Sequence, residues 1–288
     1  MEFAIIGNNY QGEKIIYTEN LINALQERSA KIKMAKDYYN SIHTLLKADI
    51  SEIELFDEND FTADVVISVG GDGTFLNAAR CVGSREIPII GINTGRLGFV
   101  ANNSPFEIDD IIDDIYTKNY TIDNRCVLHL NCNGEKIKRP FALNEIAVLK
   151  RDDASMISIE THVNNSYLST YQSDGLIIST PTGSTAYSLS VGGPIIEPNS
   201  QTLLITPIAP HSLNVRPFVI QDNVDIKLSV KSRNHNFLVS IDGVSYTFNE
   251  NTKLTISKAT HYVKIIQRRN HLFYDTLRDK LLWGADKR

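Results

Sequence analysis

Cysteine is scarce in this sequence, and the few cysteines lie far apart. The 288 residues include three, at Cys81, Cys126 and Cys132. Three are too few for a disulfide scaffold, and their spacing lacks the close pairs of a zinc site. Cys132 alternates with Leu128 and Leu130, which favours a buried strand position for it. The seven histidines form no HExxH or similar ligand pair, so we expect no metal site built from protein ligands.

The sequence also lacks an excess of basic charge and any long hydrophobic run. A formal net charge of −5 gives no field that would attract nucleic acid or an anionic membrane. No stretch approaches the length of a membrane span, and the first residues lack the basic and apolar regions of a signal peptide. We therefore expect a cytoplasmic protein that binds neither nucleic acid nor membrane. A local site could still bind a phosphorylated ligand.

The first third of the chain alternates between short apolar runs and helical spacing. Strands are expected at Phe3–Ile6, Val65–Ile67 and Pro88–Ile92, and helices at about 12–27 and 108–115. Continuous apolar strands separated by helices indicate a parallel sheet that is covered on both faces. At 288 residues, with 42% hydrophobic and 22% charged residues, the chain can form two packed domains.

Near residue 120 the hydrophobic period changes to two. Apolar and polar residues alternate at 128–132, 157–163 and 224–230, which predicts an antiparallel β domain. The fold class is therefore α/β plus β, with an α/β domain at 1–119 and a β-rich domain at 120–265. A C-terminal segment at 266–288, helical in its periodicity beyond Arg268, could pack back on the first domain.

The segment Gly70-Gly71-Asp72-Gly73-Thr74 lies between a buried strand and the helix-like stretch Phe75–Cys81. Glycines at such a turn let backbone N–H groups approach a phosphate, and Thr74 is expected to cap the helix. Asp72 would repel a phosphate unless it positions a hydroxyl, takes its proton or meets Mg²⁺. A tight turn with a capping aspartate is the structural alternative.

A second loop, Asn93–Phe99, follows the third strand. Ligands gather at the carboxyl ends of parallel strands, so both loops are expected to line one crevice. Arg96 could pair with a phosphate there, or Gly95 and Gly98 could merely turn the chain and leave Arg96 solvated.

Asn144 and Glu145 interrupt the apolar stretch Phe141–Leu149. Neighbouring residues of a strand point to opposite faces, unless a bend brings both toward one ligand. An amide and a carboxylate could together recognise a purine edge or a ribose diol. An edge-strand turn is the alternative.

The segment Asp174–Tyr187 combines a strand that ends at Ser179, a turn at Pro181–Gly183 and a helix expected to begin at Ser184. Its hydroxyls and helix start make a second candidate site for ribose or pyrophosphate. Ser184 lacks the Gly-x-Ser-x-Gly surroundings of a nucleophile, so we expect it to form hydrogen bonds only. A purely structural serine-rich turn is the other interpretation.

Together, these segments resemble the NAD kinase family. Its marks are a GGDGT loop, an NxGxLGF loop, an Asn-Glu pair and a DGLIxSTPTGSTAY segment, found here at 70–74, 93–99, 144–145 and 174–187. His211–Pro217 and Asp242-Gly243 look like later landmarks of the family, so the match runs from about residue 64 to 245. GGDG alone also occurs in diacylglycerol and sphingosine kinases and in phosphofructokinases, whereas the combination with TPTGSTAY is far more specific.

The resemblance implies transfer of the γ-phosphoryl group of ATP to the 2′-hydroxyl of the adenosine ribose of NAD, giving NADP and ADP. It implies a Rossmann-like first domain, a homo-oligomer (dimer or tetramer), and Mg²⁺ on the ATP phosphates. Asp72 would be the catalytic residue. The NAD site would comprise Asp72, Gly73, Asn144, Glu145, Asp174, Thr185, Ala186, Tyr187, Ser188, Leu189, Ser190 and Asp242. Our hypothetical phosphate contacts are Gly70, Gly71, Thr74 and Asn93.

Two departures from the family pattern affect NAD contacts. Val244 stands where many relatives have glutamine, and Gln172 where others have a basic residue. They leave open an adenine contact, the contacts to the pyrophosphate or nicotinamide half, and the use of NADH. The use of polyphosphate, regulation by NADPH and oligomer size stay open as well.

Two other functions compete with this one. A lipid kinase shares the GGDG loop, but the sequence has no basic amphipathic helix to meet a membrane. A dinucleotide sensor of the same fold could dispense with Asp72, which is present here.

Overall fold

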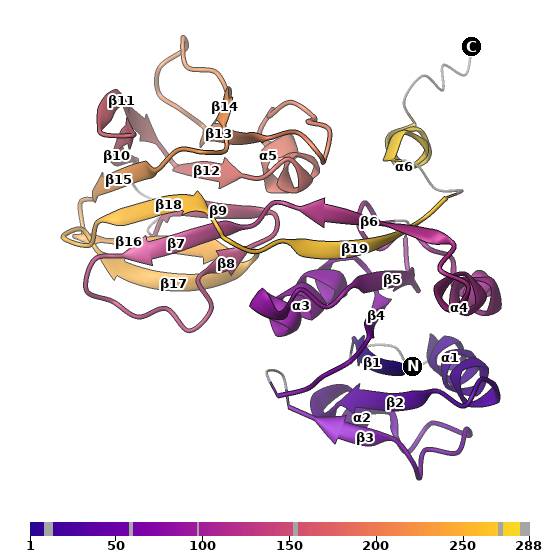
Figure 1. The fold of residues 1–288 in the computed structure, drawn as a ribbon. Helices are drawn as coiled ribbons and strands as arrows, with labels where there is room; N and C mark the ends of the chain where they lie inside the picture. Colours follow the sequence, from indigo (N-terminus) through magenta and orange to yellow (C-terminus); the bar gives the residue numbers. More distant parts are fainter. Residues whose placement is uncertain (9–13, 58–59, 97, 152–154, 270–272, 283–288) are drawn as a thin grey trace. The chain divides into compact units, whose positions relative to one another are not determined.

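The computed structural model describes residues 1–8, 14–57, 60–96, 98–151, 155–269 and 273–282 (Figure 1). The chain divides into two compact units, and each is described by itself. Unit 1 comprises Met1–Asn124 and the C-terminal residues from Val263, and unit 2 comprises Arg125–Tyr262. Within the described residues, every helix is too short or too polar to span a membrane.

Unit 1 is built on a seven-stranded sheet of order β3-β2-β1-β4-β5-β19-β6. Its strands are β1 (Glu2–Gly7), β2 (Lys31–Ala35), β3 (Glu54–Phe56), β4 (Val65–Gly70), β5 (Ile89–Asn93), β6 (Tyr120–Arg125) and β19 (Val263–Arg268). The pairings from β3 through β5 to β19 are parallel. The chain runs outward from β1 to β2 and β3, then returns to form β4 on the other side of β1. Such a reversal opens a crevice at the carboxyl ends of the two strands.

The helices of unit 1 are α1 (Ile15–Glu27), α2 (Lys36–Ile42), α3 (Asp72–Val82), α4 (Ile108–Tyr116) and α6 (Phe273–Leu281), with short 3₁₀ turns η2 (Gly83–Arg85) and η3 (Pro105–Glu107). Helix α4 buries its four isoleucines because they recur at helical spacing, and it packs beside α1. The expected strands and the helix at 108–115 are confirmed. The helix expected at 12–27 is confirmed from Ile15, whereas residues 12 and 13 lie outside the described residues.

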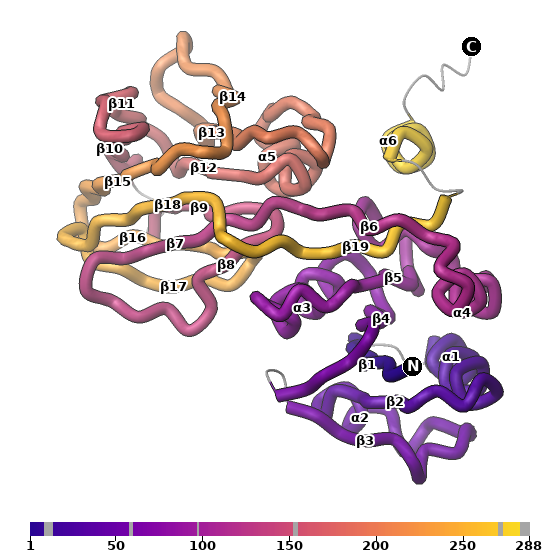
Figure 2. Tube along the Cα trace, in the orientation of Figure 1, coloured from indigo at the N-terminus to yellow at the C-terminus, as the bar shows by residue number. Residues whose placement is uncertain are grey.

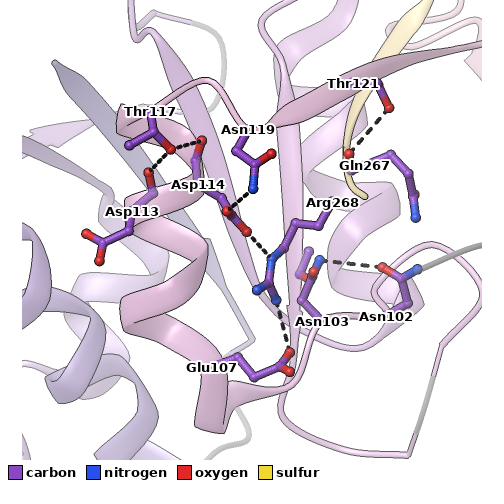
Figure 3. A network of polar contacts seen from close by, with 11 residues as sticks. Asn102, Asn103, Glu107, Asp113, Asp114, Thr117, Asn119, Thr121, Gln267 and Arg268 are labelled. Atoms are coloured by element: carbon purple, nitrogen blue, oxygen red, sulfur yellow. Dashed lines mark hydrogen bonds and ion pairs between the residues drawn. The ribbon is translucent and has the colours of Figure 1, made fainter. Parts of the chain in front are cut away.

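The C-terminal strand β19 lies between β5 and β6, as the tube in Figure 2 shows. Arg268 at its end donates to two carboxylates, Asp114 Oδ2 (2.7 Å) and Glu107 Oε2 (3.0 Å) (Figure 3). The side chain of Arg268 is only 11% exposed, so this network fixes the last residue of β19 to α4 and η3. Sequence periodicity predicted neither β19 nor β2 and β3.

Unit 2 contains two six-stranded sheets, with the orders β11-β10-β15-β18-β7-β8 and β14-β13-β12-β9-β16-β17, and each pairing that the structure resolves is antiparallel. The strands are β7 (Leu128–Cys132), β8 (Phe141–Ala142), β9 (Glu145–Lys150), β10 (Ile157–Val163), β11 (Ser166–Ser173), β12 (Gly175–Ser179), β13 (Thr202–Ile208), β14 (Phe218–Gln221), β15 (Ile226–Lys231), β16 (Asn236–Ile241), β17 (Val244–Asn249) and β18 (Leu254–Lys258).

Alternating apolar residues from both sheets of unit 2 form one core, for example Leu130 and Ile159 from one sheet and Val148 and Ile178 from the other. Two short helices, η4 (Thr182–Thr185) and α5 (Tyr187–Ser190), follow β12. The predicted fold class, α/β plus β, is confirmed by the parallel sheet of unit 1 and these antiparallel sheets.

Candidate active site

The two loops predicted to share one crevice do leave neighbouring strands of unit 1. Strands β4 and β5 pair in register at Gly70 and Asn93, the last residue of each. The N–H of Thr94 donates to the carbonyl of Gly70 at 3.3 Å. The glycine-rich turn and the Asn93 loop therefore begin side by side at the carboxyl edge of the sheet.

Asp72 is the first residue of α3, and its carboxylate is bound by the Asn93 loop. It accepts hydrogen bonds from three consecutive backbone N–H groups, those of Phe99 (2.8 Å), Val100 (3.1 Å) and Ala101 (3.0 Å). A Cβ atom on Gly98 would lie 2.0 Å from Asp72 Oδ1, so the loop can approach this carboxylate only with glycine there. Asp72 keeps 31% of its side chain exposed and is fixed in position without being sealed off.

Asn93 and Asn103 hold the loop in shape. The Asn93 amide donates to the carbonyls of Arg96 (2.8 Å) and Ala101 (2.7 Å), and its oxygen accepts from the N–H of Gly95 (2.7 Å). Asn103 donates back to the carbonyl of Gly91 at 3.0 Å. The side chain of Asn93 thus organises the loop, while its phosphate contact stays a prediction.

Arg96 and Leu97 are two further residues of the loop. Arg96 is exposed to solvent, and its pairing with a phosphate stays a prediction. Leu97 of the motif lies outside the described residues.

The three glycines of the GGDGT turn have different surroundings. A Cβ on Gly70 would lie 2.1 Å from Thr74 Oγ1, whereas one on Gly71 or Gly73 would meet nothing within 4 Å. Gly70 is therefore required by packing, and Gly71 and Gly73 leave open space in front of the backbone. The prediction that Thr74 caps α3 is wrong: Gly71 is the N-cap, because the Thr74 N–H already donates to the Gly71 carbonyl within the first turn.

That open space belongs to a cavity of about 410 Å³ in unit 1. The glycine turn and the rest of α3 contribute one side of the lining, and the ends of β1, β2 and β3 together with the first turn of α2 contribute the other. An ion pair of Lys36 with Asp57 (2.6 Å) lies on its wall. Sequence reasoning missed this half of the site, although the Gly7-Asn8 turn after the first strand was a usable signal.

In unit 2, a bend at Leu143 and Asn144 separates β8 from β9, and Glu145 is the first residue of β9, so the alternative of a bend that the sequence left open is the one the structure has. The carboxylate of Asp242 fixes this bend. It accepts from three consecutive N–H groups, those of Leu143 (2.7 Å), Asn144 (2.9 Å) and Glu145 (3.0 Å). Asp242 has φ 44° and Gly243 has φ 82°, so they form the two-residue left-handed turn that joins β16 to β17.

Glu145 is a buried carboxyl group beside another acid. Burial raises the pKa of Glu145 to about 7, and the charge of Asp242 acts in the same direction. A backbone hydrogen bond from Tyr187 opposes both effects. Among the described atoms, Glu145 Oε2 is buried and has no hydrogen-bond partner. A buried acceptor left open in this way is suited to a hydroxyl or amine of a ligand.

The segment after β12 is attached to the same bend. Thr180 donates its N–H to the Asn144 carbonyl (2.9 Å) and its hydroxyl to the Leu143 carbonyl (2.6 Å). A Cβ on Gly183 would lie 2.1 Å from the Asn144 oxygen, so this close approach also requires glycine. The structure thus brings Asn144, Glu145, Asp242 and the start of the helical segment together within unit 2.

Residues 182–190 form two short helices where the sequence predicted one from Ser184, because the backbone at Ala186 (φ −103°, ψ −127°) is not helical. Ser184 and Ser188 are fully buried, and their hydroxyls bond to Pro181 and Thr206. The other residues of the predicted contact run, Thr185, Ala186, Tyr187, Leu189 and Ser190, are half-buried or exposed.

Asp174 lies apart from this group. In the pairing of β9 with β12, Ser179 faces Glu145 and Gly175 faces Leu149, so Asp174 precedes the opposite end of β12. Ser179 is five positions beyond Asp174 along the strand, about 16 Å at 3.3 Å per residue. Asp174 forms an ion pair with Lys150 at 2.8 Å.

The two residues at which the sequence departs from the family pattern have ordinary surface positions. Gln172, on β11, donates to Ser158 Oγ at 2.9 Å. Val244 begins β17 and is 39% exposed.

A glycine turn at a reversal point of a parallel sheet is typical of nucleotide binding, and a fixed carboxylate beside it can orient a hydroxyl, so the fold and the site indicate a phosphotransferase that uses a nucleotide. Residues 3–120 match the ATP-NAD kinase N-terminal domain, and residues 143–268 match the ATP-NAD kinase C-terminal domain. The chain belongs to the NAD kinase family.

Known relatives agree over the whole length of the chain. The NAD kinase of Bacteroides fragilis (strain ATCC 25285) is 56% identical over 289 residues, and that of Flavobacterium psychrophilum is 43% identical over 294, each match covering 100% of both chains. Yeast NADH kinase, solved with NADH, has the same fold with a TM-score of 0.92 at 19% identity, covering 100% of this chain and 89% of its own. An NAD kinase from Archaeoglobus fulgidus, solved with ATP, gives a TM-score of 0.74 at 26% identity, covering 99% and 98%.

Proposed function

We propose that this protein transfers the γ-phosphoryl group of ATP to the 2′-hydroxyl of the adenosine ribose of NAD, with NADP and ADP as products. The observation that carries the proposal is the Asp72 carboxylate, which is held by three N–H groups at the mouth of the glycine turn. Membership of the NAD kinase family supports the same reaction.

Unit 1 supplies the donor site. The cavity beside Gly71 and Gly73 has room for a nucleotide, and a ligand can approach the backbone there because no side chain intervenes. The N-terminus of α3 favours negative charge at this point, which suits the phosphates of ATP. Gly70 and Thr74 support the turn by packing against each other.

Mg²⁺ enters this reaction together with ATP. No group of three His, Cys, Asp or Glu side chains in the described part of the chain gathers where it could hold an ion. The phosphates of ATP are themselves good ligands for Mg²⁺, which retains several waters and needs few protein ligands. The ion neutralises charge on the phosphates when it is bound.

Asp72 acts on the acceptor hydroxyl. Phosphoryl transfer has a loose transition state, so positioning and charge neutralisation dominate over early proton removal. A carboxylate fixed by three N–H groups can orient a ribose hydroxyl at small entropic cost. Asp72 then accepts the proton as the new phosphate ester forms.

Unit 2 supplies contacts to NAD. Glu145 Oε2 is a buried acceptor without a partner, which a ribose hydroxyl would satisfy. Asn144 offers an amide beside it, Asp242 fixes the backbone of both residues, and the surface of residues 185–190 provides further contacts. Asp174 would contribute from the other end of β12.

Separate observations support a homo-oligomer and a cytoplasmic location. Phe218 and Val219 are exposed on β14, an edge strand of its sheet, which supports a homo-oligomer. Light scattering on the purified protein measures its mass in solution. All three cysteines are free and buried, which supports a reducing cytoplasm.

The test of the reaction is an NADP-forming assay with ATP, Mg²⁺ and NAD, comparing the native protein with Asp72→Asn. We expect native turnover and a loss of at least about 100-fold in the variant, with NAD binding retained. Native turnover with a fully active variant would remove the role of Asp72 but keep the reaction. Tight NAD binding without native turnover would instead indicate a dinucleotide sensor.

A further inference from the structure

Lys280, near the end of the C-terminal helix α6, reaches the Asp72 carboxylate. Its Nζ lies 3.4 Å from Asp72 Oδ2 and 4.4 Å from the centre of the Phe99 ring. Phe99 is the same residue whose N–H donates to Oδ2, so the ammonium group rests on the loop that holds the carboxylate. Residues more than 200 positions apart in the sequence thus meet at one oxygen atom.

The face of α6 that carries Lys280 is its buried face. Thr276 and Leu277 are 1% and 5% exposed, and they lie four and three residues before Lys280, on the same side of the helix. The side chain of Lys280 is 30% exposed, so the ion pair with Asp72 is not closed off from solvent. An exposed ion pair of this kind contributes little to the stability of the fold, so stability does not account for the position of Lys280 beside Asp72.

Asp72 presents an electrostatic difficulty for its own reaction. Its negative charge lies between Gly71 and Gly73, which line the cavity assigned to the donor. A triphosphate would be repelled there unless a positive charge lies close to the carboxylate. Lys280 supplies such a charge from outside the glycine turn.

We propose that Lys280 is a positioning residue of the phosphoryl-transfer site. It holds Oδ2 of Asp72 in place and offsets the charge of the carboxylate while the donor phosphates occupy the crevice. The proposal rests on the proposed role of Asp72. It assigns a function to α6, which contributes no residue to the site predicted from the sequence.

The test compares the kinetics of Lys280→Met, Lys280→Arg and a control, Arg278→Met. Arg278 lies on the same helix, is 60% exposed and pairs with Asp275. We expect Lys280→Met to lower kcat and raise KM for ATP, a combined loss of about tenfold to a hundredfold in kcat/KM, with KM for NAD unchanged. Lys280→Arg should restore most of the loss because it keeps the charge, and Arg278→Met should behave like the native protein.

Three results would overturn the proposal. One is native-like kcat and KM for ATP in Lys280→Met, and another is a loss that appears equally in KM for NAD. The third is a loss that arginine does not rescue although circular dichroism and Tm show a native fold. Lys280→Gln, which keeps a polar side chain, provides a second variant if the methionine protein is insoluble.

The role of Asp72 is tested separately by Asp72→Asn. If that variant is fully active, the proposal for Lys280 falls with the role of Asp72. If Asp72→Asn is inactive while Lys280→Met is native-like, only the assignment of Lys280 is wrong.

Discussion

Asp72 in unit 1 and Asp242 in unit 2 are held by the same hydrogen-bonding arrangement. Each carboxylate accepts hydrogen bonds from three consecutive backbone N–H groups of a loop distant in sequence. The neighbours of the two carboxylates differ. Asp72 has a lysine beside it and lies between two glycines that line a cavity, whereas the charge of Asp242 helps to raise the pKa of Glu145. The same hydrogen-bonding arrangement thus positions the proposed catalytic carboxylate in unit 1 and fixes the bend of the proposed NAD site in unit 2.

The largest effect is expected from a substitution that disrupts the hydrogen bonds to Asp72 and leaves Asp72 itself unchanged. In Gly98→Ala the new methyl group would lie 2.0 Å from Asp72 Oδ1, so the carboxylate or the loop must move. We expect kcat to fall about 100-fold, as a displaced catalytic group does. The NADP-forming assay measures it.

Gly95→Ala is the matched control, because its new Cβ would be 3.7 Å from the nearest atoms, an ordinary contact. Equal activity of the two variants would show that the position of Asp72 does not limit the reaction.

An intermediate effect is expected from removing the hydrogen bonds to Asp242 in unit 2. Asp242→Ala leaves three N–H groups without their acceptor and puts alanine at φ 44°, a conformation that asparagine tolerates better. We expect a loss of about 2–4 kcal/mol in the free energy of unfolding and a KM for NAD raised about tenfold. Denaturant unfolding and steady-state kinetics measure these quantities.

Asp242→Asn should lie between the native protein and Asp242→Ala, since it keeps the turn and one acceptor oxygen. KM for ATP should not change in either variant. A change in KM for ATP as large as that for NAD would contradict the assignment of this bend to NAD.

The smallest effect concerns the proton on Glu145. Its pKa is raised from 4.5 to about 7 in the folded protein, so the native state binds this proton more tightly than the unfolded chain. Stability from this group is therefore present below pH 4.5 and is lost as the pH rises toward 7. Glu145→Gln removes that loss, and we expect it to be more stable than the native protein by about 2 kcal/mol at pH 8.

The same variant should bind NAD less well at pH 8, because the amide offers a weaker acceptor than the carboxylate. Thermal unfolding at pH 5 and pH 8, with and without NAD, measures both effects. Equal Tm differences between the two proteins at both pH values would contradict a raised pKa for Glu145.

The sequence predicts those parts of the fold and the site that depend on local pattern. Phe3–Ile6 and Val65–Ile67 are continuous apolar runs, and Ile108–Ile115 has helical spacing, so their structures follow from their own residues. Strand β2 was not predicted, because Lys31 and Lys33 interrupt a five-residue stretch that is too short to show a hydrophobic period. The start of α3 was misplaced because Gly71 and Thr74 are both acceptable caps, and backbone hydrogen bonds choose between them.

The parts of the site that the sequence did not predict depend on contacts between residues that are far apart in the chain. Nothing near Asp72 indicates that its partners are Phe99, Val100 and Ala101, and Asp242 is about a hundred positions from its donors. The donor cavity is lined from the ends of β1, β2 and β3, from α2 and from the glycine turn, and β2, β3 and α2 were not predicted. Lys280 reaches Asp72 only because the chain returns to unit 1 through β19.

The return of the chain to unit 1 through β19 also determines when the sheet of unit 1 can be completed during synthesis. Since β19 lies between β5 and β6, the sheet of unit 1 lacks an internal strand until the ribosome has made residues beyond 262. The first 124 residues are synthesised early, but β5 and β6 can pair with β19 only after the whole β-rich unit has been synthesised. A chain released before that point would carry both open edges into the cell, where they invite association with other unfinished chains.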